Sequence, residues 1–181
     1  MIETLRLKIR GLLFEDWAAL KSISLDFGAS EYAIYDMHLP TDDKEIQMLC
    51  GKFSSSGLWY AVCLGQRMIG YICFHENNGS YDIGFCFHSD HNGKGYAYES
   101  CSALIEHIAK ERDITLFTAG TALENKPARR LIEKLGFVLK DTETVSFHKD
   151  QNGNDITFEG GIFYREYPVK KNEKKKPAVL E

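Results

Sequence analysis

The chain has 181 residues, of which 44% are apolar, and a formal net charge of −4, which fits one soluble domain with a hydrophobic core. No apolar run approaches the roughly 18–20 residues that a membrane-spanning helix needs, so we expect neither a span nor a membrane partner. Five lysines against two glutamates give residues 168–181 a charge of +3 and leave −7 on the rest, which argues against nucleic acid as the main partner and favours a cationic substrate.

The N-terminus alternates apolar and charged residues, unlike a secretory signal, so we expect a cytoplasmic protein. The cysteines are odd in number and lack C-x-x-C spacing, so we expect reduced, mostly buried thiols and no metal site. They are Cys50, Cys63, Cys73, Cys86 and Cys101. We divide the chain into a domain of residues 1–167 and a lysine-rich, solvated tail of residues 168–181.

The first half of the chain predicts a strand, two helices and a meander. Residues 5–9 alternate apolar and basic side chains, as in a half-buried strand. Helices are predicted over residues 14–25 and from an N-cap at Thr41 to Gly51, with the following FSSSG as a loop. Three strands separated by turn signals follow at residues 59–64, 68–74 and 81–87.

The second half predicts a helix, a strand, a second helix and a hairpin. Apolar residues between Ala97 and Ile108 share one helical face, and a short strand follows at 114–118. A helix begins near Pro127 and ends at Gly136. The final strands, 137–147 and 156–167, flank an Asn-Gly turn. This order predicts an α/β (α+β) fold with a mixed, mostly antiparallel sheet of about seven strands, flanking helices and one parallel crossover.

The loop that contains Gly93 and Gly95 lies between a predicted strand and a predicted helix. Such a loop binds phosphate, because unpaired backbone N–H groups gather at the positive end of the helix dipole. The chain does not supply the G-x-x-x-x-G-K-S/T of a P-loop here, and Tyr98 is too bulky for the last small position of a dinucleotide fingerprint. Both common nucleotide-binding folds are therefore disfavoured.

These residues resemble the GNAT acetyltransferase superfamily, in the branch of the ribosomal-protein N-terminal acetyltransferases. The family carries Q/R-x-x-G-x-G/A at this place, and residues 92–97, NGKGYA, fit it except at the first position. The fit extends to Glu99. Downstream, residues 125–128, NKPA, and 133–137, EKLGF, resemble the family's N-x-x-S/A helix start and its E-K-x-G-F end. The resemblance covers essentially residues 1–167.

The resemblance implies acetyl-coenzyme A as co-substrate, with its pyrophosphate on backbone N–H groups of the glycine loop. Lys94 could add charge or simply face solvent, and Asn125 is a coenzyme contact or simply an N-cap. The pantetheine arm would pair with the splayed end of the strand 81–87. The residues implied are Asn92, Gly93, Lys94, Gly95, Tyr96, Ala97 and Asn125, together with Phe85, Cys86 and Phe87 beside the arm.

Acetyl transfer to an amine needs a base, because an ammonium group has no lone pair. Asp82 stands where many family members carry a carboxylate, and we expect it to draw the proton, directly or through water. It could instead be solvated or orient a cationic acceptor. Further candidates are His75, Glu76 and His148.

The leaving thiolate needs a hydrogen-bond donor, which family members take from a tyrosine or a serine on the helix that begins at residue 125. Those positions are Ile132 and Ala128 here, and neither can donate. Tyr164 or Tyr98 could substitute, although a tyrosine on a strand is more often part of the core.

The predicted function is N-acetyl transfer from acetyl-coenzyme A directly to a primary amine. An aminoglycoside or polyamine, an amino acid and a protein N-terminus are all compatible acceptors, selected by the loops around Ser30–Pro40 and the final hairpin. A homodimer is left open. The competing class is a non-catalytic module that binds acyl-coenzyme A or a protein partner.

Overall fold

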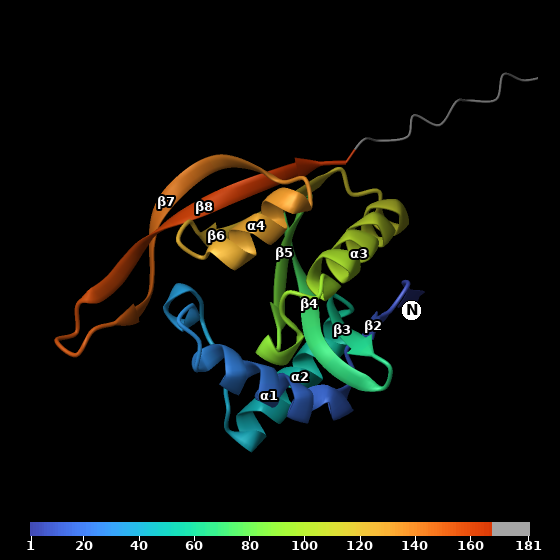
Figure 1. The fold of residues 1–181 in the computed structure, drawn as a ribbon, viewed down its shortest axis with the longest axis horizontal. Coiled ribbons are helices and arrows are strands. Elements are labelled where there is room, and N and C mark those ends of the chain that lie inside the picture. Colours follow the sequence, from blue (N-terminus) through green and yellow to red (C-terminus); the bar gives the residue numbers. More distant parts are fainter. Residues whose placement is uncertain (168–181) are drawn as a thin grey trace, which may run out of the picture.

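The computed structural model describes residues 1–167, which form one eight-stranded sheet flanked by four α-helices (Figure 1). The sheet order is β1-β2-β3-β4-β5-β6-β8-β7, and β5 and β6 are its one parallel pair of neighbours in this part of the chain. The predicted mixed, mostly antiparallel α/β fold is confirmed. The strands are β1 (Ile2–Glu3), β2 (Lys8–Gly11), β3 (Trp59–Leu64), β4 (Arg67–Asn77), β5 (Ser80–Phe87), β6 (Leu116–Ala122), β7 (Val138–Lys149) and β8 (Asp155–Glu166). The predicted tail lies outside the described residues.

The structure has one strand more than the predicted seven, because β1 lies before the predicted N-terminal strand of residues 5–9, which itself begins only at Lys8. The described chain turns between β1 and β2, with the Thr4 N–H donating to the Leu7 carbonyl at 2.9 Å. Leu5 therefore projects into solvent, 94% exposed, although its place in the alternation predicted a strand residue. A two-residue strand is too short to show the period of two on which the prediction depended.

Two pairs of helices cover opposite faces of the sheet (Figure 1). The first pair, α1 (Trp17–Gly28) and α2 (Asp43–Ser56), buries Leu20 and Ile46 against one face. The second pair, α3 (Tyr96–Arg112) and α4 (Lys126–Lys134), buries Leu104 and Ile132 against the other. Short 3-10 helices are η1 (Phe14–Asp16), η2 (Ala33–Tyr35) and η3 (Ser89–His91). In residues 1–167 no helix is both long and apolar enough to cross a membrane.

Helix α2 begins and ends later than predicted. Its N-cap is Asp42, whose carboxylate accepts the N–H groups of Lys44 and Glu45 at 2.9 and 3.1 Å, so the predicted Thr41 cap was wrong. The serines predicted as a loop are helical, and hydroxyls such as that of Ser55 donate to carbonyls one turn earlier instead of ending the helix. Gly57 then ends the helix with φ 68°.

The sheet opens between its two central strands. β5 pairs with β4 along its whole length, and β6 pairs with β8 along its whole length. Between β5 and β6, however, only Tyr81 and Asp82 pair, with Phe117 and Thr118. The strands therefore diverge after Asp82 and leave unpaired backbone on both sides of a gap.

The β7–β8 hairpin extends beyond the rest of the sheet as the orange and red arm of Figure 1. The loop between α1 and α2 lies against it. The Tyr35 ring meets Phe158 edge-on at a centroid distance of 5.2 Å, and His148 Nε2 donates to the Asp36 carbonyl at 2.8 Å. These contacts join two segments that are more than 100 residues apart in the chain.

The five cysteines are free thiols, as predicted, and all but Cys86 are buried. Burial raises the pKa of Cys73 and of Cys86 to about 12. These thiols are therefore neutral and unreactive at physiological pH.

Candidate functional site

The gap between β5 and β6 exposes backbone hydrogen-bonding groups of β5. The His88 N–H donates to the Ile69 carbonyl at 3.0 Å, which fixes the register of β5 against β4. Backbone groups alternate in direction along a strand, so Cys86 and Gly84 also bond toward β4, whereas Ile83, Phe85 and Phe87 direct theirs into the gap. An extended amide-containing chain in the gap could hydrogen-bond with them. Of the three predicted residues on this strand, Phe85 and Phe87 thus offer backbone groups and Cys86 does not.

A cavity of about 260 Å³ passes through this gap. It is lined from both sides of the sheet, by α4 on one side and by α1 and the η2 loop on the other. The lining residues are Phe27, Tyr35, Asp36, Ile83, Gly84, Phe85, Gly120, Thr121, Ala122, Asn125, Ala128, Ile132, Glu143, Val145, Phe147, Phe158, Gly160, Gly161 and Ile162. A ligand entering from the α4 side could thus meet a second ligand from the other side.

The glycine loop follows directly after β5 and ends at the start of α3. Gly93 and Gly95 have φ angles of 72° and 80°, a conformation that other residues rarely adopt. The first hydrogen bond of α3 runs from the Glu99 N–H to the Gly95 carbonyl at 3.0 Å. The N–H groups at the preceding helical positions have no acceptor within the helix, as at any helix start. The loop could therefore hold a phosphate group.

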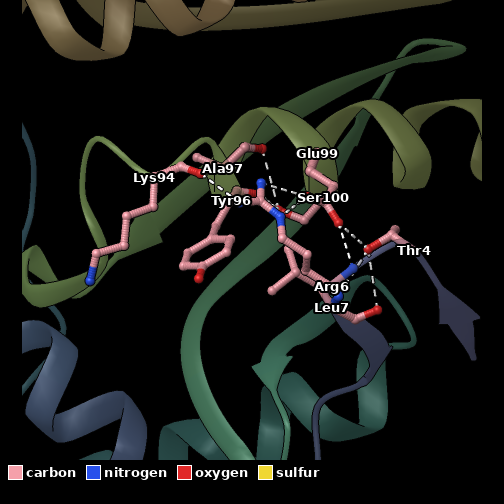
Figure 2. Close-up of polar contacts among 8 residues, drawn as sticks. All are labelled: Thr4, Arg6, Leu7, Lys94, Tyr96, Ala97, Glu99 and Ser100. Carbon is pink, nitrogen blue, oxygen red and sulfur yellow. Dashed lines mark hydrogen bonds and ion pairs between the residues drawn. The ribbon is translucent and has the colours of Figure 1, made fainter.

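Side chains of the N-terminal segment contact this loop and the first turn of α3, as Figure 2 shows. Arg6 Nη1 donates to the Lys94 carbonyl at 2.9 Å, and Arg6 also pairs with the Glu99 carboxylate at 2.7 Å. The Thr4 hydroxyl donates to the same carboxylate at 2.6 Å. Burial opposes ionisation of Glu99, but the hydrogen bonds from Thr4 and Arg6 outweigh it and lower the pKa of Glu99. The charged carboxylate therefore holds Arg6 against the loop.

The remaining side chains of the loop lie in different environments. Lys94 Nζ donates to the Asp90 carbonyl at 2.7 Å and remains exposed, so its ammonium stays close to the loop. The Arg6 guanidinium lies over the Tyr96 ring at 4.5 Å, which holds that ring beside the loop. Asn92 is exposed and caps η3. Ala97 is half-buried in the first turn of α3.

Asn125 is the N-cap of α4 and also lines the cavity. Its Oδ1 accepts the Ala128 N–H at 3.3 Å, so the side-chain carbonyl acts as the N-cap of α4, as one of the two interpretations from the sequence predicted. Within residues 1–167 its Nδ2 has no hydrogen-bond partner and could contact a bound ligand. Ala128 and Ile132 line the same cavity, so α4 presents apolar groups at the two positions where a hydroxyl was expected from the resemblance.

Asp82 lies at the closed end of the gap. It is half-buried, and the Thr118 hydroxyl donates to its Oδ1 at 2.8 Å. Burial raises the pKa of Asp82, although the Thr118 hydrogen bond and the charge of His75 partly oppose this shift. A carboxylate with a raised pKa is a better proton acceptor than an exposed one.

Tyr164 lies in the same row of the sheet as Asp82. The register pairs Asp82 with Thr118, and Thr118 with Tyr164. Because neighbouring strands are about 4.8 Å apart, Tyr164 lies about 10 Å from Asp82. Neither residue is part of the cavity lining, and Tyr164 is 38% exposed. The structure thus brings the two predicted catalytic residues to one level of the sheet, but not into contact.

The other candidates lie in different places. His75 pairs with Asp82 across β4 and β5, and Glu76 follows it at the exposed end of β4. Tyr98 stacks against the Lys134 ammonium at 4.3 Å, away from the cavity lining. His148 holds the η2 loop through the Asp36 carbonyl. Of these four, His75 lies nearest to Asp82.

Four polar residues that line the cavity were not predicted as site residues from the sequence, namely Tyr35, Asp36, Thr121 and Glu143. Tyr35 and Asp36 fall in a stretch without clear periodicity, for which only a role in acceptor selection was predicted. Thr121 lies beyond the predicted end of its strand, because β6 runs to Ala122 and not to residue 118. Glu143 lies among other exposed polar residues of β7, so no hydrophobic pattern or motif distinguished it as a site residue.

Comparisons with known proteins agree with this geometry. A family model described as Acetyltransferase (GNAT) domain matches residues 6–138. The uncharacterized N-acetyltransferase YnaD of Bacillus subtilis is 29% identical over 138 residues, which are 75% of this chain and 81% of the relative. An acetyltransferase (GNAT family) structure from Bacillus anthracis has a TM-score of 0.74 at 24% identity, over 91% of this chain and 97% of that chain. RimL, a ribosomal L7/L12 alpha-N-protein acetyltransferase solved with coenzyme A, gives 0.75 at 19% identity, over 90% and 95%.

Proposed function

Because the chain belongs to the GNAT acetyltransferase family and is thereby an acetyl-coenzyme A-dependent acetyltransferase, we propose that it moves acetyl directly to a primary amine in a ternary complex. The observation that carries the proposal is the cavity through the sheet. It extends from α4 on one face, through the gap beside β5, to the η2 loop and the β7–β8 hairpin on the other face. Donor and acceptor can therefore enter from opposite faces and react in the middle.

The coenzyme site is assigned to the glycine loop, the gap and α4. The diphosphate accepts hydrogen bonds from backbone N–H groups between Asn92 and Ala97, where the helix dipole also favours negative charge. The pantetheine amides pair with the free backbone groups of Phe85 and Ile83, and Asn125 Nδ2 contacts the arm. Since β5 leads back from the loop toward Asp82, this orientation places the thioester near the closed end of the gap.

The amine nitrogen attacks the carbonyl carbon of the thioester, a C–N bond forms, and the C–S bond breaks to release the coenzyme thiolate. The amine must lose one proton before attack and a second as the amide forms. Asp82 accepts the first proton, through a water molecule where the amine does not reach it, and the second proton passes to the departing thiolate or to solvent. Its raised pKa and its place at the end of the gap support this role.

The thiolate must be protonated or hydrogen-bonded as it leaves. Tyr164 is one candidate donor, since it lies in the row of Asp82. Thr121 is the competing candidate donor, because it lies on β6 and lines the cavity. Comparing Tyr164→Phe with Thr121→Val in single-turnover experiments separates them, since loss of the true donor slows the chemical step and leaves acetyl-coenzyme A affinity unchanged.

The acceptor is an amine of a small molecule or a protein N-terminus. RimL is described as an N-terminal protein acetyltransferase, which makes peptide N-termini worth testing. At 19% identity this likeness concerns the fold, so the acceptor class is left to the assay.

The test is a panel of polyamines, aminoglycosides, amino acids and short peptides, incubated with acetyl-coenzyme A and the purified protein. We expect amine-dependent release of free thiol and an acetylated product of 42 Da added mass, with Asp82→Asn as the low-activity control. Tight binding of acetyl-coenzyme A without thiol release across the panel would contradict the proposal and favour a non-catalytic coenzyme-binding module.

A further inference from the structure

The acceptor side of the cavity is lined by acidic but not by basic side chains. Of the residues that line the cavity in the described chain, two are acidic, Asp36 and Glu143, and none is lysine, arginine or histidine. The other walls on this side are the aromatic side chains of Phe27, Tyr35, Phe147 and Phe158. Carboxylates among aromatic rings favour a cation that carries an apolar neighbour.

We infer that this acceptor site selects a protonated primary amine without an adjacent carboxylate, with Asp36 binding the ammonium group and Glu143 repelling anionic acceptors. The inference rests on the proposed function and narrows its substrate class. It admits peptide N-termini and polyamines and excludes free amino acids, whose α-carboxylate would enter the same negative pocket as the amine.

Asp36 is held in a defined position from both sides. Its Oδ1 accepts the Met37 N–H at 2.7 Å, and its carbonyl accepts the His148 Nε2–H at 2.8 Å. The preceding Tyr35 packs against Phe158 on the hairpin. Oδ2 has no partner within residues 1–167, so it is free to accept a hydrogen bond from a ligand.

The surroundings of Asp36 strengthen its interaction with a cation. The residue is open to solvent on the cavity side, yet the protein around it is dense enough to raise the pKa of its carboxyl, although the Met37 N–H and the nearby His38 and His148 oppose the shift. A partly desolvated carboxylate attracts a cation more strongly than one in bulk water. An incoming ammonium group also favours the ionised form of Asp36.

Glu143 approaches the cavity from the opposite wall. It lies on β7 in register with Gly160 of β8, and both residues line the cavity. A Cβ atom on Gly160 would come within 2.8 Å of Val145, so only glycine fits there without displacement. Val145, which also lines the cavity, packs over Gly160 next to Glu143 on the same strand, so an anionic group in this part of the cavity would face a second carboxylate.

The test uses matched acceptors that differ in one charge. Phenylalaninamide and phenylalanine share the amine and the side chain, but only phenylalanine has a carboxylate, and alaninamide with alanine repeats the comparison for a small side chain. After correction for the fraction of unprotonated amine, which is larger for the amide at neutral pH, we expect kcat/KM to favour the amide at least tenfold in each pair. Asp36→Asn should lower kcat/KM for the amide about tenfold or more, and Asp36→Glu should restore part of the lost kcat/KM. Glu143→Gln should raise kcat/KM for the amino acid and so reduce the preference for the amide.

Asp141→Asn is the matched control, since this exposed carboxylate lies on the same strand outside the cavity lining. Its kinetics should equal those of the wild type. Acetyl-coenzyme A affinity, measured for each variant by calorimetry, confirms that the variant is folded. Equal use of amide and amino acid by the wild type, or kinetics of Asp36→Asn that match those of Asp141→Asn, would overturn the inference.

A second readout separates this inference from the proposed function. Calorimetry on the coenzyme A-loaded protein measures the binding of phenylalaninamide and phenylalanine without any chemistry. Preferential binding of the amide that Asp36→Asn abolishes supports the charge selection even if no acetyl is transferred. Equal binding, or binding of neither compound, counts against it. Failure of the protein to bind acetyl-coenzyme A at all would instead refute the proposed function.

Discussion

The two sides of the cavity are built in different ways. On the proposed coenzyme side, the contacts would come from backbone groups of the glycine loop and from the Asn125 amide at the start of α4, and each belongs to one short stretch of chain. On the proposed acceptor side, Asp36 and Glu143 would act through side chains and come from segments more than 100 residues apart. Backbone contacts depend little on which side chains are present, so they suit a constant donor such as acetyl-coenzyme A. Side-chain contacts can be altered by single substitutions, which would change the preferred acceptor amine. Variants that affect one side and spare the other test this difference.

The largest effect is expected for Asp82→Asn, which removes the proposed base at the boundary of the two sides. General-base catalysis contributes typically 10²–10⁴-fold, so kcat should fall about 100-fold or more while acetyl-coenzyme A affinity stays unchanged. Steady-state kinetics and calorimetry measure the two effects. Wild-type turnover in this variant would remove Asp82 from the mechanism.

The same variant has a predicted effect on stability. Burial raises the pKa of Asp82 in the folded protein, so the folded state binds this proton more tightly than the unfolded state does. The ionised carboxylate therefore costs stability once the pH exceeds the unfolded pKa. Asp82→Asn should melt at or above the wild-type temperature at pH 7, and a clearly lower melting temperature would show that the charge stabilises the fold.

The next largest effect should fall on the coenzyme side alone. Arg6→Ala removes the hydrogen bond to the Lys94 carbonyl and the ion pair with Glu99, which is only 17% exposed. A loss of about 1.4 kcal/mol would weaken acetyl-coenzyme A binding about tenfold. Acceptor KM should not change.

Lys8→Ala is the control for this variant, since the pair of Lys8 with Glu3 is exposed on both sides. Such surface pairs contribute little. If Lys8→Ala weakened acetyl-coenzyme A binding as much as Arg6→Ala does, the effect would reflect overall charge and not the fixed loop.

A smaller effect is expected on the acceptor side alone. His148→Phe keeps an aromatic ring beside His38 but removes the hydrogen bond that positions Asp36. A neutral hydrogen bond contributes about 0.5–1.5 kcal/mol, so acceptor KM should rise about threefold with acetyl-coenzyme A affinity unchanged. An effect on the coenzyme side would mean that the two sides are not independent.

The smallest effect is a shift of the pH profile. The Thr118 hydroxyl donates to Asp82 and favours the ionised form. Thr118→Val removes this stabilisation and should raise the pKa of Asp82 further, so the acidic limb of the kcat/KM profile moves to higher pH. A limb that stays in place would indicate that another group titrates there.

The same difference between the two sides explains what the sequence could predict. The glycine loop, the Asn125 cap and the order of elements depend on short-range patterns, namely positive-φ glycines, an N-cap and apolar periodicity. Those features were visible in the sequence, and the family and fold predicted from them are confirmed.

The acceptor side depends on contacts that no local pattern encodes. Asp36 follows a 3-10 turn without periodicity, and Glu143 lies on a strand of exposed polar residues. Their approach depends on the His148 and Tyr35 contacts between the loop and the hairpin. The alignment of Asp82, Thr118 and Tyr164 likewise depends on strand register. Spacing in the sequence could suggest the loops involved but not which of their residues meet.

The divergence of β5 from β6 also has a consequence for hydrogen–deuterium exchange. Along one strand, the amides of Gly84 and Cys86 bond to β4, whereas those of Ile83 and Phe85 face the gap. In the free protein, exchange should therefore be slow and fast at alternating positions. An occupied coenzyme site would slow the fast positions and leave their neighbours unchanged. The exchange rates of alternating β5 amides would therefore report, residue by residue, whether the donor is bound.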